Sequence, residues 1–313
     1  MIVSVSRRTD IPAFYSEWFY NRLKAGYVYV INPFNRKQIS RINLTPQTID
    51  CFVFWTKDPG PMMIRLDELK GYSYYFQFTL TAYRNDVEKN VRKKNDIIKT
   101  FIDLSNRIGK EKVVWRYDPI FINDYYTEAY HYEWFKQLCA KLQGCTEKCV
   151  VSFLDLYAKT QHNTKSLKIK ILTEEDARRI AKNLADIGSE FHITLETCSE
   201  KIDLSECGIH RSKCIDDKLI QQIIGSKVSV KKDHTQREEC GCVKSIDIGQ
   251  YNTCQHFCAY CYANFNDIQV KQNCEIYDPE SPILMYRLHG DEKITERLMP
   301  TICERQIEQL TLI

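Results

Sequence analysis

Residues 149–196 begin with the apolar run "CVVSFL" (149–154) and end with the apolar run "FHITLE" (191–196). Short runs rich in β-branched and aromatic residues are typical of buried strands. A helical pattern over residues 173–187 separates the two runs. It opens with "TEED", in which Thr173 can cap the helix and Asp176 stands at the third helical position. The stretch therefore predicts a strand, a helix and a second strand in succession.

The same alternation recurs along most of the chain. Further strands are predicted at residues 2–6, 50–55, 74–80, 112–117 and 244–249, and further helices at about 16–25, 62–70, 86–108 and 128–142. Strands that alternate with helices predict an α/β fold with a parallel sheet and right-handed crossovers. We favour a full or partial (β/α) barrel of seven or eight strands over a doubly wound sheet. Residues 1–313 are expected to form one domain, with a β-hairpin insertion at 26–42.

Composition and charge narrow the classes of function. The chain has 313 residues, with 44 Lys and Arg against 41 Asp and Glu, a net charge of +3. This near balance disfavours binding to nucleic acid or to an anionic membrane surface. No leader sequence and no apolar stretch of about 18 to 20 residues is visible, so we expect a cytoplasmic protein with no membrane partner. Fourteen cysteines in a reducing compartment predict metal ligation rather than disulfides.

The cysteines gather in residues 198–274, which we expect to be an iron-sulfur cluster-binding region. The segment "YNTCQHFCAYCYAN" (251–264) holds Cys254, Cys258 and Cys261 in a C-x3-C-x2-C array. Three thiolates cannot complete a tetrahedral zinc site, although His256 or Cys274 is an alternative fourth ligand. On a [4Fe-4S] cluster, three thiolates leave one iron free for a substrate or cofactor.

This array, with the aromatic Tyr260 before the last cysteine and the strand "SIDIG" ahead of it, resembles the signature of the radical S-adenosylmethionine superfamily. The resemblance implies that the three cysteines bind a [4Fe-4S] cluster and that S-adenosyl-L-methionine chelates the free iron. It also implies that reductive cleavage of this cofactor yields a 5′-deoxyadenosyl radical, which abstracts hydrogen from a substrate. The electron would come from an external reductant such as a flavodoxin or ferredoxin.

The position of the motif departs from the superfamily, in most of which the loop follows the first barrel strand. If residues 244–249 correspond to that first strand, residues 2–6 form the second and the barrel is circularly permuted. The segments "SVSRRTDIPAFY", "VFWTKDP" and "WRYDPI" also resemble an uncharacterised prokaryotic domain-of-unknown-function family with a C-terminal cluster motif. "YCYA" is locally similar to spore photoproduct lyases.

A second set of cysteines precedes the motif. Five thiols follow the last predicted strands, more than ordinary burial would place there. We expect four of them, Cys198, Cys214, Cys240 and Cys242, to bind an auxiliary iron-sulfur cluster, with Cys207 the spare. Gly241 allows the tight backbone that brings two thiolates to one side. Structural zinc and the absence of any metal are the alternatives.

Polar residues at the ends of the predicted strands supply the remaining site residues, since ligands bind at the carboxyl ends of parallel strands. We expect Arg116 and Asp118, which alternate on one strand face, to be catalytic. Residues expected to bind the cofactor are Arg7, Arg8, Asp10, Thr79, Glu196 and Tyr260. The glycine-glycine-acid motif that binds the cofactor's amino group in the superfamily is not visible after "SVS".

Three functions follow from these residues. The first is a radical S-adenosylmethionine enzyme that acts on an unidentified small-molecule or peptide substrate. The second is an iron-sulfur electron-transfer or scaffold protein without radical chemistry. The third is repair of nucleic-acid lesions, by the resemblance to photoproduct lyase, and the near-neutral charge disfavours it.

Overall fold

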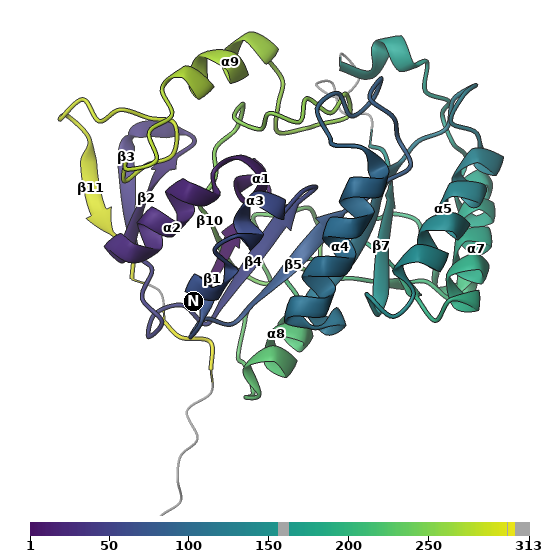
Figure 1. Ribbon diagram of the computed structural model, residues 1–313, viewed down its shortest axis with the longest axis horizontal. Coiled ribbons are helices and arrows are strands. Elements are labelled where there is room, and N and C mark those ends of the chain that lie inside the picture. Colours follow the sequence, from purple (N-terminus) through teal and green to yellow (C-terminus); the bar gives the residue numbers. More distant parts are fainter. Residues whose placement is uncertain (156–162, 299, 304–313) are drawn as a thin grey trace, which may run out of the picture.

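The computed structural model describes residues 1–155, 163–298 and 300–303. Its main sheet has eight parallel strands in the spatial order β10-β1-β4-β5-β6-β7-β8-β9 (Figure 1). In chain order these are β1 (Ile2–Val5), β4 (Cys51–Thr56), β5 (Tyr74–Thr79), β6 (Val113–Ile120), β7 (Lys148–Phe153), β8 (Thr194–Thr197), β9 (His210–Arg211) and β10 (Ile246–Asp247). The predicted α/β fold with a parallel sheet is confirmed. Within this sheet, the last strand in sequence, β10, lies beside the first, β1, and forms one edge.

Helices connect the strands. They are α1 (Ile11–Phe14), α2 (Ser16–Ala25), α3 (Gly60–Met63), α4 (Lys94–Ile108), α5 (Glu128–Leu142), α7 (Glu174–Glu190), α8 (Asp217–Ile224) and α9 (Asp267–Glu275). Short 3-10 turns occupy Leu66–Leu69, Lys110–Lys112, Lys165–Leu167 and Ser205–Cys207. Thr173 and Asp176 form the predicted capping box of α7.

The strand pleat divides the core in two. One set of strand side chains, including Phe54, Phe76 and Trp115, packs in the larger core with apolar residues of α2, α4, α5 and α7. The alternate set, Ile2, Cys51, Val53, Tyr75, Val114 and Val150, packs against the chain segment that carries α8 and the second cysteine set. Side chains two positions apart on a strand share a face. Polar residues that follow the apolar ones on this second face therefore lie at the carboxyl ends of the strands.

The helix predicted at residues 86–108 begins only at Lys94. Residues before it turn instead, and their backbone pairs with the three-cysteine loop. Ala259 N donates to Val87 O over 2.8 Å, and Asn90 N donates to His256 O over 3.1 Å. A continuous helix would use these backbone groups for its own hydrogen bonds. The contact with the three-cysteine loop therefore determines where α4 begins.

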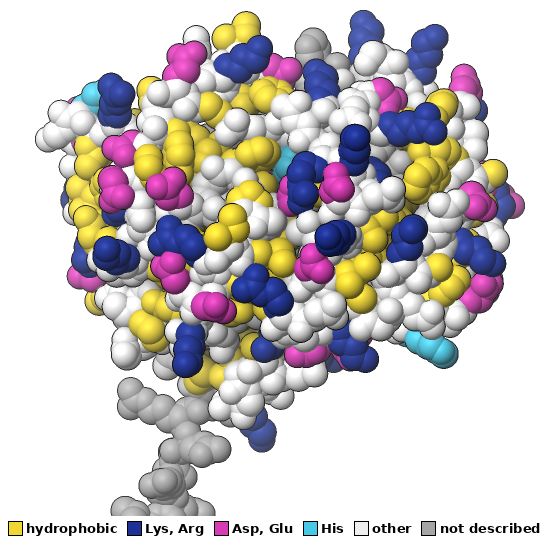
Figure 2. Space-filling model, in the orientation of Figure 1, with side chains coloured by type: hydrophobic (Ala, Val, Ile, Leu, Met, Phe, Trp, Pro, Cys, Tyr) yellow, Lys and Arg dark blue, Asp and Glu magenta, His cyan; other side chains and the backbone are white. Residues whose placement is uncertain are grey.

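A smaller sheet lies beside the main one. β2 (Tyr27–Asn32) and β3 (Asn35–Asn43) form an antiparallel hairpin, and β11 (Lys293–Glu296) adds to β3 in parallel (Figure 1). In the described part of the chain, no helix has the length and apolar character needed to cross a membrane. Basic and acidic side chains are intermixed over the face shown in Figure 2.

Candidate functional site

A cavity of about 680 Å³ opens at the carboxyl ends of the main-sheet strands. Both cysteine sets line it: Cys254, Cys258 and Cys261 from the loop after β10, and Cys198, Cys214, Cys240 and Cys242 from the segments after β8 and β9. Seven of the eight other predicted site residues also line it, namely Arg7, Arg8, Asp10, Thr79, Arg116, Asp118 and Tyr260. Residues more than 200 positions apart in sequence therefore share one wall, because parallel strands end at the same edge.

One hydrogen bond joins the three-cysteine loop to Tyr15, and another closes a turn within the loop. Tyr15 Oη donates to Thr253 O over 2.5 Å, and Cys261 N donates to Cys258 O over 3.0 Å. Burial raises the pKa of the Cys258 thiol to about 12, and it also raises the pKa values of Cys254 and Cys261. These thiols would therefore become thiolates at neutral pH only with a bound cation or metal to stabilise the charge.

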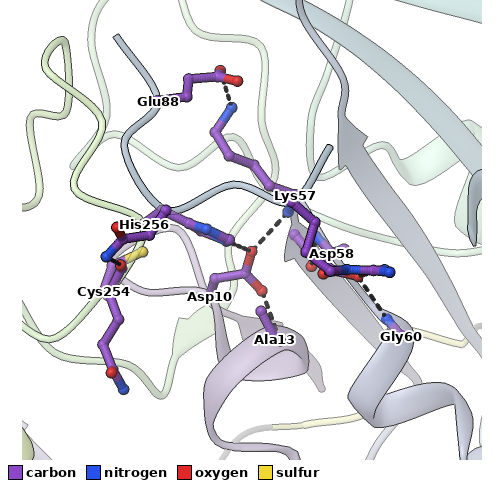
Figure 3. Close-up of polar contacts among 12 residues, drawn as sticks. Asp10, Ala13, Lys57, Asp58, Gly60, Glu88, Cys254 and His256 are labelled. Atoms are coloured by element: carbon purple, nitrogen blue, oxygen red, sulfur yellow. Dashed lines mark hydrogen bonds and ion pairs between the residues drawn. The ribbon is translucent and has the colours of Figure 1, made fainter. Parts of the chain in front are cut away.

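Asp10 ties the loop to the sheet (Figure 3). Its Oδ2 lies 2.7 Å from Lys57 N and 2.8 Å from His256 Nε2, and its Oδ1 accepts from Ala13 N over 3.0 Å as the cap of α1. Both carboxylate oxygens are thus occupied by protein groups. The residue lies in the cavity wall as predicted, but its bonds make it a positioning group for the loop rather than a free ligand.

A buried charge network stands behind Tyr260. Lys57 Nζ donates to Glu88 Oε1 and to Tyr260 Oη, both over 2.8 Å, and Lys94 Nζ donates to Glu88 Oε2 over 2.6 Å. Burial opposes charge on both partners. The two ammonium groups nevertheless hold the pKa of Glu88 well below its usual range, and Glu88 and Cys258 hold the pKa of Lys57 above its own. Lys57 therefore presents a fixed positive charge to the cavity beside Cys258.

Sequence reasoning missed this network. "FWTKD" marked a polar strand end, which was the available signal for Lys57. Glu88 gave none, because it fell inside a predicted helix and its partner Lys57 lies 31 residues away.

Arg7 and Arg8 surround a buried carboxylate. Asp247 on β10 accepts from Ser4 Oγ over 2.9 Å, from Ser6 Oγ over 2.6 Å and from Arg7 N over 2.8 Å. Burial disfavours the charged Arg7, but the combined attraction of Asp247, Cys242, Tyr262 and Cys214 outweighs burial and raises the pKa of this guanidinium. Both arginines line the cavity, where a guanidinium can bind an anionic group.

Gly249 is required where β10 meets β1. A Cβ at this position would lie 2.1 Å from Ser6 Oγ and 2.6 Å from Ser6 Cβ. We therefore expect Gly249→Ala to lower the free energy of unfolding by about 1–3 kcal/mol through overpacking. The check compares the shift in denaturant midpoint that Gly249→Ala causes in the wild type with the shift it causes in a Ser6→Gly background, because Ser6→Gly alone already removes the bonds of Ser6 Oγ to Asp247 and from Arg8 N. Equal shifts in the two backgrounds would contradict the steric explanation.

Arg116 and Asp118 form a buried ion pair that faces the second cysteine set. Arg116 Nε donates to Asp118 Oδ1 over 3.1 Å, and its Nη2 donates to Asp118 Oδ2. Its Nη1 lies 2.9 Å from Cys214 Sγ and 3.3 Å from Gln77 Oε1. The side chain also stacks over Trp55. Both residues, which alternate on one strand face, therefore line the cavity; their catalytic role stays a prediction.

The second cysteine set is compact. The sulfurs of Cys198 and Cys214 are 2.9 Å apart, and Cys242 Sγ accepts from Ile215 N, the residue next to Cys214, over 3.4 Å. Hydrogen bonding from Cys242 lowers the pKa of Cys240 to about 6. Cys207 lies outside this group, with its Sγ 3.6 Å from Arg178 O. Within the described residues, no group of three or more His, Cys, Asp or Glu side chains has an arrangement that could hold a single metal ion.

Glu196 is the predicted site residue that the structure does not bring to the cavity. Its carboxylate lies 3.0 Å from Lys148 Nζ, which also pairs with Asp216. This pair sits toward the amino end of β7, since Lys148 is the first residue of that strand. Glu196 is therefore placed as a partner of Lys148, away from the thiols.

Comparisons with known proteins identify a family without a described activity. A family model described as "Domain of unknown function (DUF1848)" matches residues 2–263, a span that includes both cysteine sets. No curated protein and no solved structure matches the chain.

Proposed function

The chain belongs to the DUF1848 family, and from the site itself we propose that it is a radical S-adenosylmethionine enzyme. One observation carries the proposal. Three thiols, those of Cys254, Cys258 and Cys261, line a large cavity at the carboxyl ends of parallel strands. A [4Fe-4S] cluster held by three thiolates has one iron without a protein ligand, and a cavity of about 680 Å³ leaves space there for a cofactor and a substrate.

The surrounding residues fit such a cluster. The donors are soft sulfur atoms, which iron-sulfur clusters prefer. Lys57, kept cationic by Glu88, faces Cys258 and offsets the negative charge of bound thiolates. Asp10 and His256 hold the loop in place from within the protein. When bound, the cluster would supply the electron that splits S-adenosyl-L-methionine into methionine and a 5′-deoxyadenosyl radical able to abstract hydrogen.

The chain's own residues have separate tasks in this proposal. Arg7 and Arg8 are the cations at the cavity edge and would bind the cofactor's carboxylate or an anionic substrate. Arg116 and Asp118 present a fixed ion pair with which a polar substrate group can exchange hydrogen bonds. Thr79 adds a hydroxyl to the wall.

We also propose that the sheet is a circularly permuted partial barrel. In most of the superfamily that the motif resembles, the cluster loop follows the first barrel strand. Here the loop follows β10, and β10 pairs in parallel with β1, Val3 opposite Ile246. In this reading β10 takes the place of the first strand, and β1 takes that of the second.

The electron and the substrate come from outside the chain. A one-electron donor such as a flavodoxin or ferredoxin would reduce the cluster, in a cytoplasmic compartment that keeps the thiols reduced. The intermixed surface charges in Figure 2 do not form a basic stripe on that face, which favours a small molecule or peptide over nucleic acid.

Anaerobic reconstitution with iron and sulfide tests the proposal. Adding S-adenosyl-L-methionine to the reduced protein should change its EPR signal, because the cofactor would bind the free iron, and dithionite should then yield 5′-deoxyadenosine. An EPR signal that the cofactor leaves unchanged, together with no 5′-deoxyadenosine, would instead indicate a fully ligated electron-transfer or scaffold protein.

A further inference from the structure

Four thiols of the second set converge from three separate segments. Cys198 follows β8, Cys214 follows β9, and Cys240 and Cys242 belong to the loop that leads into β10. The sulfurs of Cys198 and Cys214 lie 2.9 Å apart, and Cys240 and Cys242 line the same part of the cavity wall and share a buried cluster with Cys214. Cysteines that are buried only as small apolar residues need not lie next to one another. Here they come together from segments up to 44 positions apart, so their grouping needs a separate explanation.

The thiols lie between a buried apolar core on one side and the cavity on the other. Cys214, Cys240 and Cys242 are buried in a core with Ile215 and Val243, and Ile215 N donates to Cys242 Sγ over 3.4 Å. All four cysteines also line the cavity. Structural zinc sites are normally closed, whereas redox clusters exchange electrons with groups beside them. A thiol set that forms the wall of a reaction cavity fits a redox cluster better than structural zinc.

A buried guanidinium supplies the second, independent observation. Arg116 is 6% exposed, and its Nη1 lies 2.9 Å from Cys214 Sγ. Asp118 fixes its orientation through two hydrogen bonds. A charged N–H donor aimed at sulfur stabilises a thiolate, and hydrogen bonds to cluster sulfurs are among the features that set cluster potentials.

We propose that this set binds a second iron-sulfur cluster of the [4Fe-4S] type, with one thiolate on each iron, from Cys198, Cys214, Cys240 and Cys242. The four thiols come from separate segments that meet at one part of the cavity wall, so each can be attached to a different iron. Four protein ligands leave no open iron, so the site serves electron transfer rather than substrate ligation. Arg116 is a positioning residue that raises the potential of this cluster. The site stands independently of the proposed radical chemistry.

Iron and sulfide analysis of the triple variant Cys254→Ala/Cys258→Ala/Cys261→Ala tests the site. After anaerobic reconstitution this variant should retain about four irons per chain and an EPR signal on reduction. In the same background, Cys242→Ala should lose the iron, and Cys207→Ala should keep it as the matched control. Zinc in place of iron, or a Cys198–Cys214 disulfide in a protein that takes up no metal, would overturn the proposal.

Two further measurements keep the test decisive if the triple variant does not fold. The wild-type protein should bind about eight irons per chain and the single variant Cys242→Ala about four, and equal iron contents of the two proteins would overturn the second cluster. Arg116→Gln should lower the midpoint potential of the second cluster, because the reduced, more negative cluster loses its cationic donor. An unchanged potential would remove Arg116 from this role. A protein that holds the second cluster but does not respond to S-adenosyl-L-methionine would contradict the proposed function alone.

Discussion

Cys258→Ala is expected to abolish formation of 5′-deoxyadenosine and to lower the iron content by about one cluster of four irons. The thiol of Cys258 is one of three that the proposed cluster needs. Burial raises its pKa to about 12, so this side chain becomes a thiolate at neutral pH only when a bound metal stabilises the charge. Changes even beyond the first ligands of a metal commonly cost about 10- to 100-fold, so loss of a ligand should cost at least about 100-fold in product formed. Mass spectrometry of 5′-deoxyadenosine and iron analysis measure both effects.

Cys274→Ala is the matched control for that variant. Cys274 lies 13 residues beyond the array, and its Sγ is 3.6 Å from Tyr15 Oη rather than in the cavity wall. Its replacement should leave iron content and 5′-deoxyadenosine close to wild type. The loop should keep its shape in Cys258→Ala, since bonds such as Ala259 N to Val87 O do not involve the thiol. Equal activities of Cys258→Ala and the wild type would refute the ligand role.

Glu88→Ala is expected to produce the largest loss of stability among single changes near the site. Glu88 is 1% exposed and bonds two ammonium groups, Lys57 over 2.8 Å and Lys94 over 2.6 Å. Removing the carboxylate leaves Lys57 buried without its anionic partner, and breaking such a pair typically costs about 3–5 kcal/mol. The measurement is the denaturant midpoint of anaerobically reconstituted protein at matched iron content.

Glu68→Ala gives the comparison. Glu68 pairs with Arg65 on the surface, where both side chains are more than a third exposed. Exposed pairs contribute about 0–1 kcal/mol, so this variant should unfold near the wild-type midpoint. If Glu88→Ala moves the midpoint no further than Glu68→Ala does, the buried network does not stabilise the fold.

The same network predicts a pH dependence with a definite sign. The two lysines hold the pKa of folded Glu88 below the ordinary value of 4.5, so its stabilisation is complete above about pH 4.5 and is lost as the pH falls below it. The stability difference between wild type and Glu88→Gln should therefore shrink progressively as the pH falls from about 4.5 toward the lowered pKa of folded Glu88. Lys57 has a raised pKa and keeps its contribution until the pH exceeds about 10.5. A difference that stays constant through the acid range would contradict this assignment.

The local pattern of apolar residues predicted most helices and strands. It failed where a segment distant in sequence forms hydrogen bonds with the same backbone groups. The predicted helix at 128–142 corresponds to α5 because its ends depend on Thr127 and neighbouring residues. The start of α4 could not be read from the sequence, since the backbone near Glu88 bonds the three-cysteine loop about 170 positions away. For the same reason the helical pattern hid Glu88 as a site residue.

The sequence by itself determined the alternating strands and helices, the three-thiol array and the four further cysteines, because each depends on residue type and short spacing. Tertiary structure decided which side chains meet. It joined Asp10 to His256, Lys57 to Glu88, and Arg116 to Cys214, and it placed Glu196 with Lys148 instead. The physical reason is the parallel sheet, which brings strand ends together whatever their separation in sequence, while the pleat and the neighbouring charges choose the partner of each side chain.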